Sequence, residues 1–108
     1  MNVRLYILQR ATAAVMAPLV LVHVAVIFYA TKHGLSAADI LGRTRGSVGW
    51  GLFYALFVLA AATHGAIGVR AIACEWTPLR GIPLHMATWA FGAVLATLGL
   101  RAVAAVVL

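Results

Sequence analysis

Hydrophobic residues fill three long stretches of the chain, and the few charged residues stand between these stretches. Uncharged runs cover residues 11–31, 46–69 and 81–100. Each run is close to the ~20 apolar residues that an α-helix needs to cross the hydrocarbon core of a bilayer. The pattern predicts three transmembrane helices, at about residues 11–31, 48–75 and 83–106.

Proline and glycine mark the ends of the second and third helices. Residues 70–74 contain neither, so the second helix is expected to continue to about Glu75, where Thr77-Pro78 then ends it. The third helix is expected to begin near Pro83 and to pack against a neighbour, because small residues recur along it at spacings of three and four. These residues are Thr88, Gly92, Ala96, Gly99 and Ala102.

The first apolar run holds Pro18, which predicts a mild kink, because neighbouring helices in lipid satisfy the carbonyl that loses its donor. This run exceeds the about 7 to 15 residues of a signal-peptide core and lacks a small-x-small cleavage site, so we expect it to remain as a span. In the connector over residues 32–45, Ser36 is an expected N-cap for a short turn over residues 37–40.

Composition narrows the class of protein. Hydrophobic residues make up 65% of the 108 residues and charged residues 9%, whereas a soluble domain carries about 25% charged residues. We therefore predict an all-α integral membrane protein with three transmembrane helices, organised as a single membrane-anchor domain over residues 1–108. So short a chain, facing lipid over most of its surface, excludes a self-contained soluble enzyme and favours one subunit of a larger complex.

The formal net charge of +6 favours anionic lipid headgroups over nucleic acid as partners, because the basic residues are scattered singly at the ends of the spans. Three spans place four basic residues on each side of the membrane, so the positive-inside rule selects no orientation. One side holds Arg4, Arg10, Arg70 and Arg80, and the other holds Lys32, Arg43, Arg45 and Arg101.

Ionisable side chains inside a span are costly and usually functional, and His64 lies well inside the hydrocarbon. It lies roughly 8 Å from the middle of the second span, with small residues around it. These are Ala60, Ala61, Gly65 and Gly68. A bulky planar macrocycle needs such space if a neutral imidazole is to reach its iron, so the pattern favours haem ligation by His64. The alternative is that His64 merely forms a hydrogen bond between helices and that the glycines serve helix packing.

His23 is expected to lie in the opposite half of the bilayer, roughly 10 Å from His64 in depth. Two ligands of one iron lie about 4 Å apart, so a partner helix must supply the second axial ligand, and His23 is expected to pack or to face a neighbouring subunit. Arg10 and Arg70 are expected on the side of the membrane where the second span ends. There they can pair with haem propionates or simply extend to the interface.

Two motifs resemble the small membrane-anchor subunits of succinate dehydrogenase, the succinate:quinone oxidoreductase of respiratory complex II. Residues 64–75 read His-x-x-x-Gly-x-Arg with an acidic residue eleven positions after the histidine, and residues 8–13 read Leu-Gln-Arg-Ala-Thr-Ala. The arginine at position 70 resembles the cytochrome b subunit, whereas Arg-Ala-Thr-Ala and the short chain resemble its smaller hydrophobic partner. Both assignments remain open. The sequence departs from the family pattern at Tyr6, Gln9, Ala71 and Trp76.

This resemblance implies the cofactor and the site residues. His64 would be an axial ligand of haem b shared with a second membrane-anchor subunit, and its metal would be the haem iron. Arg10 would lie at the quinone pocket or a haem propionate, with Glu75 and Trp76 near the quinone. FAD and iron–sulfur clusters would belong to a flavoprotein subunit and an iron–sulfur subunit, and the multi-pass complex would reside in the bacterial cytoplasmic (inner) membrane.

Two other functions compete with this one: a haem-free structural anchor and a small three-span transporter subunit. A transporter is expected to carry an acidic residue at mid-membrane or a repeated half. Neither Asp39 nor Glu75 lies at mid-membrane, which counts against a transporter.

Overall fold

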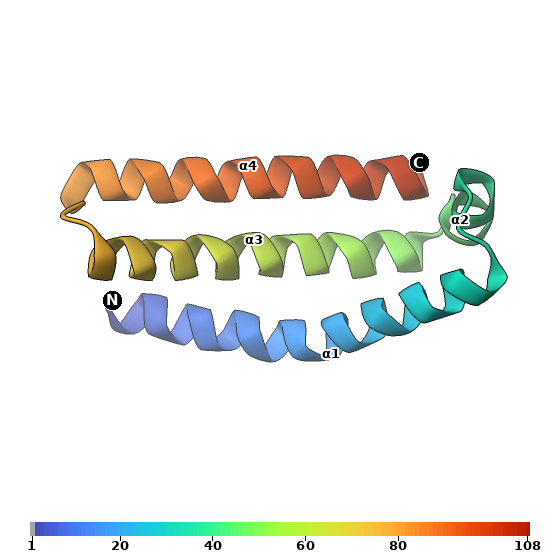
Figure 1. Ribbon diagram of the computed structural model, residues 1–108, viewed down its shortest axis with the longest axis horizontal. Coiled ribbons are helices and arrows are strands. Elements are labelled where there is room, and N and C mark those ends of the chain that lie inside the picture. Colours follow the sequence, from blue (N-terminus) through green and yellow to red (C-terminus); the bar gives the residue numbers. More distant parts are fainter. Residues whose placement is uncertain (1) are drawn as a thin grey trace.

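The computed structural model describes residues 2–108, which form four helices and no strands. These are α1 (Val3–His33), α2 (Ala37–Thr44), α3 (Val48–Trp76) and α4 (Gly81–Val107). The three long helices run antiparallel to their neighbours, with α3 between α1 and α4 (Figure 1). All three are long and apolar enough to cross a membrane, and the 48 Å length of the bundle is close to the ~40–45 Å of a whole bilayer. The prediction of an all-α protein with three spans is confirmed.

The helix bounds extend the predicted ones. α1 begins at Val3 instead of residue 11, because residues 3–10 contain no glycine or proline and the Asn2 side chain caps them, accepting a hydrogen bond of 2.9 Å from the Leu5 amide. α4 begins at Gly81, so Pro83 lies in its first turn, where a missing N–H costs little. α1 is one helix through Pro18, and Figure 1 shows it changing direction near its middle, as predicted.

Small residues set the contact between α3 and α4. A Cβ added at Gly92 would lie 3.2 Å from the Ala66 Cβ, and one added at Gly99 would overlap the side chain of Val58. The two backbones can approach this closely because those positions are glycine. The small-residue stripe predicted on the third span therefore packs against α3.

The short helix α2 closes one end of the bundle. Its N-cap, Ser36, forms a reciprocal capping box with Asp39, and the helix runs four residues beyond the predicted turn. The buried Thr44 hydroxyl lies 2.6 Å from the carbonyl oxygen of Val106, and the Gly46 amide donates to the carbonyl of Val107 at 2.8 Å. These contacts satisfy carbonyls at the end of α4 that have no partner within their own helix.

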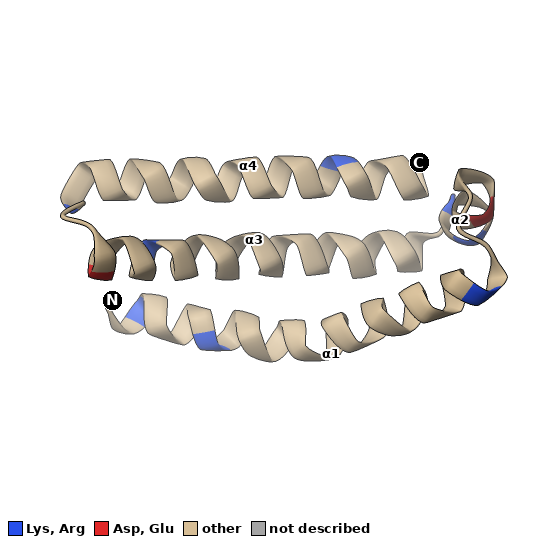
Figure 2. Cartoon of the chain, in the orientation of Figure 1, with Lys and Arg blue, Asp and Glu red and all other residues tan. Residues whose placement is uncertain are grey.

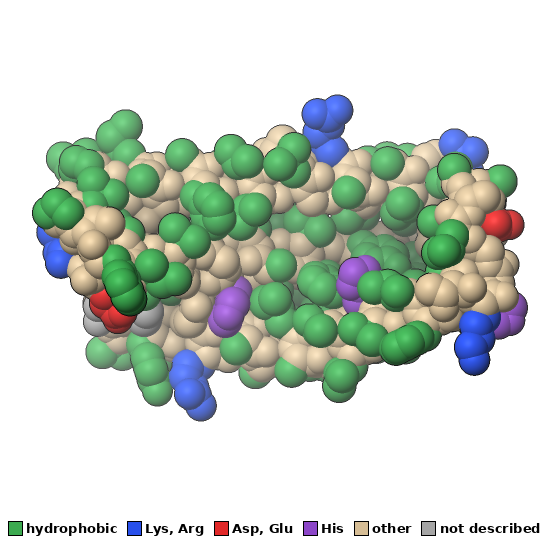
Figure 3. Space-filling model, viewed as in Figure 1, with side chains coloured by type: hydrophobic (Ala, Val, Ile, Leu, Met, Phe, Trp, Pro, Cys, Tyr) green, Lys and Arg blue, Asp and Glu red, His purple; other side chains and the backbone are tan. Residues whose placement is uncertain are grey.

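Hydrophobic side chains cover the outside of the bundle, as Figure 3 shows for one face. The charged residues lie towards its two ends and in α2 (Figure 2). We call the end with the start of α1 and the end of α3 the amino-terminal end, and the opposite end the α2 end. Arg4, Arg10, Arg70 and Arg80 belong to the amino-terminal end, which is the distribution that the three-span reading predicts.

Candidate functional site

Two histidines occupy the seam between α1 and α3 at different depths, and Figure 3 shows histidine side chains along this seam. His64 contacts Thr12, whereas His23 contacts Phe57. Phe57 precedes His64 by seven residues on α3, which is about 10 Å along the helix. The structure therefore confirms that the two histidines lie too far apart to ligate one iron.

The Thr12 hydroxyl fixes the orientation of the His64 ring. Its Oγ1 lies 3.2 Å from His64 Nδ1 and donates to a backbone carbonyl of its own helix, with the Leu8 oxygen at 2.9 Å and the Gln9 oxygen at 3.0 Å. A hydroxyl has one proton to donate. When the carbonyls take that proton, Oγ1 is left to accept a hydrogen bond from Nδ1–H of His64, and in this tautomer Nε2 keeps a free lone pair.

The His64 ring borders an open hollow of about 540 Å³ on the α1 side. We name it the His64 hollow, lined by Tyr6, Gln9, Arg10, Ala13, Ala14 and His64. The Arg10 guanidinium lies 6.0 Å from the centre of the Tyr6 ring. Among the described residues, Gln9 Oε1 is buried there without a hydrogen-bond partner. The hollow thus joins an imidazole, a permanent cation and an unused acceptor, beside the two small residues Ala13 and Ala14.

The two glycines near His64 face different neighbours. Gly68 lies about 40° from His64 around α3, and a Cβ there would lie 3.5 Å from Gln9 Nε2, so Gly68 adjoins the His64 hollow. A Cβ at Gly65 would lie 3.4 Å from the Leu95 side chain of α4. The expectation that Gly65 leaves space beside the His64 ring is wrong, because this glycine serves the contact between α3 and α4.

The structure separates the predicted arginines. Arg10 lines the His64 hollow, whereas Arg70 lines a second hollow together with Arg4 and His85. Arg70 follows His64 by six residues, which turns it about 240° around α3. Within this chain the two arginines therefore do not converge on one group, although both lie at the amino-terminal end.

Glu75 and Trp76 lie at the last turn of α3, also at the amino-terminal end. Glu75 follows His64 by eleven residues and shares its face of α3 within about 20°. Both side chains are exposed, Trp76 to 81%. Neither lines the His64 hollow, so these two residues share an end of the bundle with Arg10 and no enclosed pocket.

A family model for the succinate dehydrogenase/fumarate reductase transmembrane subunit matches residues 1–107. The chain belongs to this family. No curated protein and no solved structure matches the chain. Family membership makes it a multi-pass membrane-anchor subunit that works with soluble catalytic partners, and it favours an anchor over a three-span transporter.

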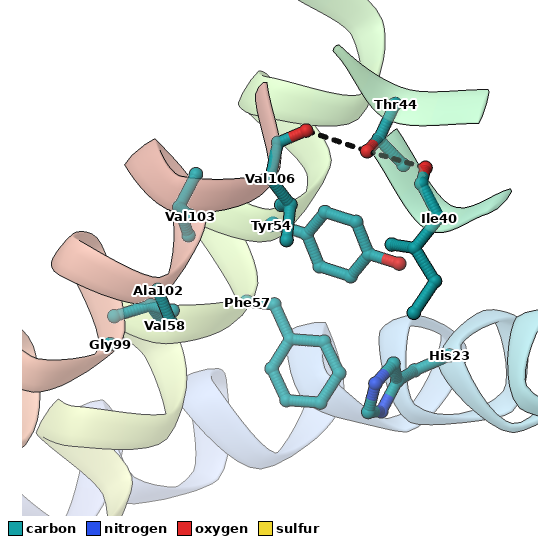
Figure 4. A pocket seen from close by; sticks show the side chains of 10 residues that line it. All are labelled: His23, Ile40, Thr44, Tyr54, Phe57, Val58, Gly99, Ala102, Val103 and Val106. Carbon is teal, nitrogen blue, oxygen red and sulfur yellow. Dashed lines mark hydrogen bonds between the residues drawn. The ribbon is translucent and has the colours of Figure 1, made fainter. Parts of the chain in front are cut away.

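At its α2 end this anchor subunit holds a smaller cavity of about 360 Å³ around His23. Figure 4 shows the His23 ring beside Phe57 and Tyr54, with side chains of α2 above them. The ring packs edge-to-face on both, with centroid distances of 5.2 Å to Phe57 and 6.1 Å to Tyr54. His23 is thus a packing histidine, one of the two roles expected from the sequence.

Thr12 is the site residue that sequence reasoning missed. It was noted only as part of the motif after Arg10, yet it is 9% exposed in a helix whose other residues, except Ala30, are less buried. The available signal was the spacing of Gln9 and Thr12, two uncharged polar residues three positions apart, which share a face of the helix.

Proposed function

We propose that this anchor subunit binds haem b through His64 and shares it with a second membrane-anchor subunit. The observation that carries the proposal is the hydrogen bond between Thr12 and His64, which leaves Nε2 as a free ligand atom. Ligating histidines commonly donate their other ring proton to a fixed acceptor, which sets the tautomer and strengthens the ligand. A bound haem supplies a one-electron redox centre. His64 would supply one ligand nitrogen to the iron, and the partner subunit would supply the second.

The rest of the His64 hollow fits the same group. Ala13 and Ala14 leave room beside the imidazole for a flat ring. Arg10 supplies a guanidinium that pairs bidentately with a carboxylate such as a propionate. The buried Gln9 Oε1 accepts a hydrogen bond from a group that enters the hollow. Gly68 lies next to the Gln9 amide, with an added Cβ 3.5 Å from Nε2, so a larger side chain there would reach the hollow.

We further propose that quinone is reduced at the amino-terminal end, with Arg10, Glu75 and Trp76 around it. The Arg10 guanidinium stabilises negative charge as it develops on a quinone oxygen, and the Trp76 indole N–H donates a neutral hydrogen bond. Glu75 lies on the same face of α3 as His64, nearer the membrane surface, where its carboxyl can exchange protons with water.

In this proposal the soluble partners complete the electron path. A flavoprotein with FAD oxidises succinate, and an iron–sulfur subunit docked at the amino-terminal end passes the electrons to quinone. The complex resides in the bacterial cytoplasmic membrane. Both assignments of the chain, as the cytochrome b subunit or as its smaller hydrophobic partner, fit this path.

An optical spectrum of the purified, dithionite-reduced complex tests haem ligation. Replacing His64 by Leu should abolish or strongly alter the reduced haem b absorbance, because no other group of the hollow replaces the imidazole nitrogen. His23→Leu is the matched control and should leave the absorbance unchanged, because that ring packs about 10 Å away on Phe57. A normal low-spin spectrum in the His64 variant would contradict the proposal and favour a haem-free anchor.

A further inference from the structure

A second hollow at the amino-terminal end takes no part in the proposed electron path. It measures about 610 Å³ and lies between the start of α1, the second half of α3 and the first half of α4. We name it the Arg70 hollow. Its walls are mostly apolar and include Leu59 and Ala62 of α3 and Ala93 of α4. An apolar hollow of this size in a membrane-spanning chain has room for a hydrocarbon chain.

Basic side chains gather at one end of this hollow. Arg4, Arg70 and His85 come from three different helices and line it together. The acidic residues of the chain are Asp39 and Glu75, and neither lines the hollow. Arg70 is half-buried, and a guanidinium that has lost part of its water is stabilised by an anion that pairs with it. The charge therefore favours an anionic occupant.

The length of the hollow matches one leaflet of a bilayer. On α4 its lining runs from His85 to Ala96, and on α3 it runs from Arg70 back to Leu59. The ends of each stretch are eleven residues apart in the sequence, which is about 16 Å of helix, and half of the ~30 Å hydrocarbon core is about 15 Å. The basic groups lie at the amino-terminal end of the hollow, and the lining residues farthest from them, Leu59 and Ala96, are apolar. A molecule fits the hollow if it has an anionic headgroup for the basic end and an apolar tail as long as one leaflet for the rest.

We propose that the Arg70 hollow binds one anionic phospholipid. Its phosphate lies between Arg4, Arg70 and His85, and an acyl chain follows the α3 and α4 walls towards the middle of the bilayer. Arginine suits this task because its planar guanidinium pairs bidentately with phosphate oxygens and keeps its charge. This assignment gives Arg70 a partner that Arg10 and the His64 hollow do not supply.

Retention of lipid by the purified protein with its bound subunits tests the headgroup contact. In detergent with phosphatidylglycerol, the wild-type protein should retain about one more anionic lipid than the Arg70→Gln variant. The affinity of the Arg70→Gln variant for phosphatidylglycerol should fall about fivefold, and Arg4→Gln should lower this affinity similarly. Arg101→Gln is the matched control, because Arg101 lies near the other end of α4. Phosphatidylcholine and inorganic phosphate are the comparison ligands, and neither should be retained at this site. Equal retention of phosphatidylcholine, or equal loss in the Arg101 variant, would overturn the proposal.

A bulky residue tests the acyl contact. Ala93 is exposed and lines the hollow, so Ala93→Trp should displace the lipid without disturbing the contact between α3 and α4. Ala87→Trp, at an exposed position of α4 outside the lining, should retain it. If Ala93→Trp keeps its lipid and instead loses another subunit on purification, a protein helix fills the hollow and the lipid assignment is wrong.

Discussion

The two histidines of the α1–α3 seam have opposite surroundings, although both are half-buried at the contact between the same two helices. The His64 ring meets a threonine hydroxyl and opens onto a hollow with Arg10 and Gln9. The His23 ring meets the edges and faces of Phe57 and Tyr54 in a cavity that is almost wholly apolar. The polar neighbour of His64 orients the ring so that one nitrogen faces the hollow. The aromatic neighbours of His23 only pack against its ring.

The ends of the bundle differ in the same sense. At the α2 end, Ile40 and Thr44 reach over the His23 cavity, and hydrogen bonds tie α2 to the end of α4. Nothing in residues 2–108 covers the His64 hollow in this way, and its Tyr6 and Arg10 side chains are exposed. One end is completed by the chain itself, while the other offers its polar groups to molecules from outside.

The change with the largest expected effect removes the cation of the open end. Arg10→Ala should lower succinate:quinone activity by about 10²- to 10³-fold, the usual loss when one charge-stabilising donor is removed. Succinate oxidation by a soluble dye should persist, because the dye takes electrons before they reach the membrane. Lys32→Ala, at the α2 end of α1, should preserve both activities.

Two other results would refute this assignment. Equal loss of both activities in the Arg10 variant would indicate failed assembly, and undiminished quinone reduction would remove Arg10 from the site.

The next change tests the threonine that distinguishes the two rings. Thr12→Val keeps the shape of the side chain and removes the acceptor for His64 Nδ1–H, so haem affinity should fall by about 10- to 100-fold. In the haem that remains, the reduction potential should rise, because a less basic imidazole stabilises the ferric iron less. Thr12→Ser restores the hydroxyl and should restore both properties. A valine variant with the wild-type potential would show that Thr12 only packs.

A smaller effect on haem content is expected at Gly68, where a substitution changes the space beside the His64 hollow. A Cβ there makes an ordinary 3.5 Å contact with the Gln9 amide, so Gly68→Ala should retain its haem. Gly68→Leu pushes the Gln9 side chain into the His64 hollow and should lower the haem content of the purified complex. Leucine favours a membrane span, so the chain should still insert. Gly65→Ala offers a control on the α4 side. Full haem content in the Gly68→Leu variant would show that Gly68 serves helix packing and not haem binding.

The fold follows from the sequence almost completely, and the reason is the bilayer. Lipid forces each apolar run into a helix, because no backbone group can remain unpaired there, so the three spans were predictable, as was the end of the second at Thr77-Pro78. The start of α1 was missed by eight residues. An arginine does not end a helix, since its side chain extends to the interface while the backbone continues.

The site was less predictable, because a side chain's face depends on rotation as well as on depth. His64 was found by its depth together with the small residues around it and the motif that it begins. The rise along α3 predicted the end of the bundle at which Arg70 lies, whereas the rotation of about 240° between His64 and Arg70 turns Arg70 towards a different hollow. Thr12 was missed because its role depends on the pairing of α1 with α3, which no local pattern specifies.

The smallest expected effect concerns the capping box that begins α2, the element that closes the His23 end. Hydrogen bonds from the Ser36 side chain and backbone lower the pKa of the Asp39 carboxyl below its usual value. Asp39 also fills the space beside Gly34, which adopts a positive φ of 125°. Because the folded pKa lies below the unfolded value of about 3.9, the ionised carboxyl stabilises α2 above that pH, and this stabilisation is lost as the pH falls through the folded pKa.

Asp39→Ala should therefore lower the hydrogen-exchange protection of residues 37–44 at neutral pH, with intrinsic rates accounted for, and should remove the loss of protection that acid causes in the wild type. Protection of α3 around Phe57 should fall slightly, because Ile40 and Thr44 of α2 share the His23 cavity with it. The haem spectrum should not change, because the His64 hollow contains no residue of α2. If the same variant altered that spectrum, the two ends of the bundle would be coupled through α1 and α3, and the contrast between the closed and the open end would fail.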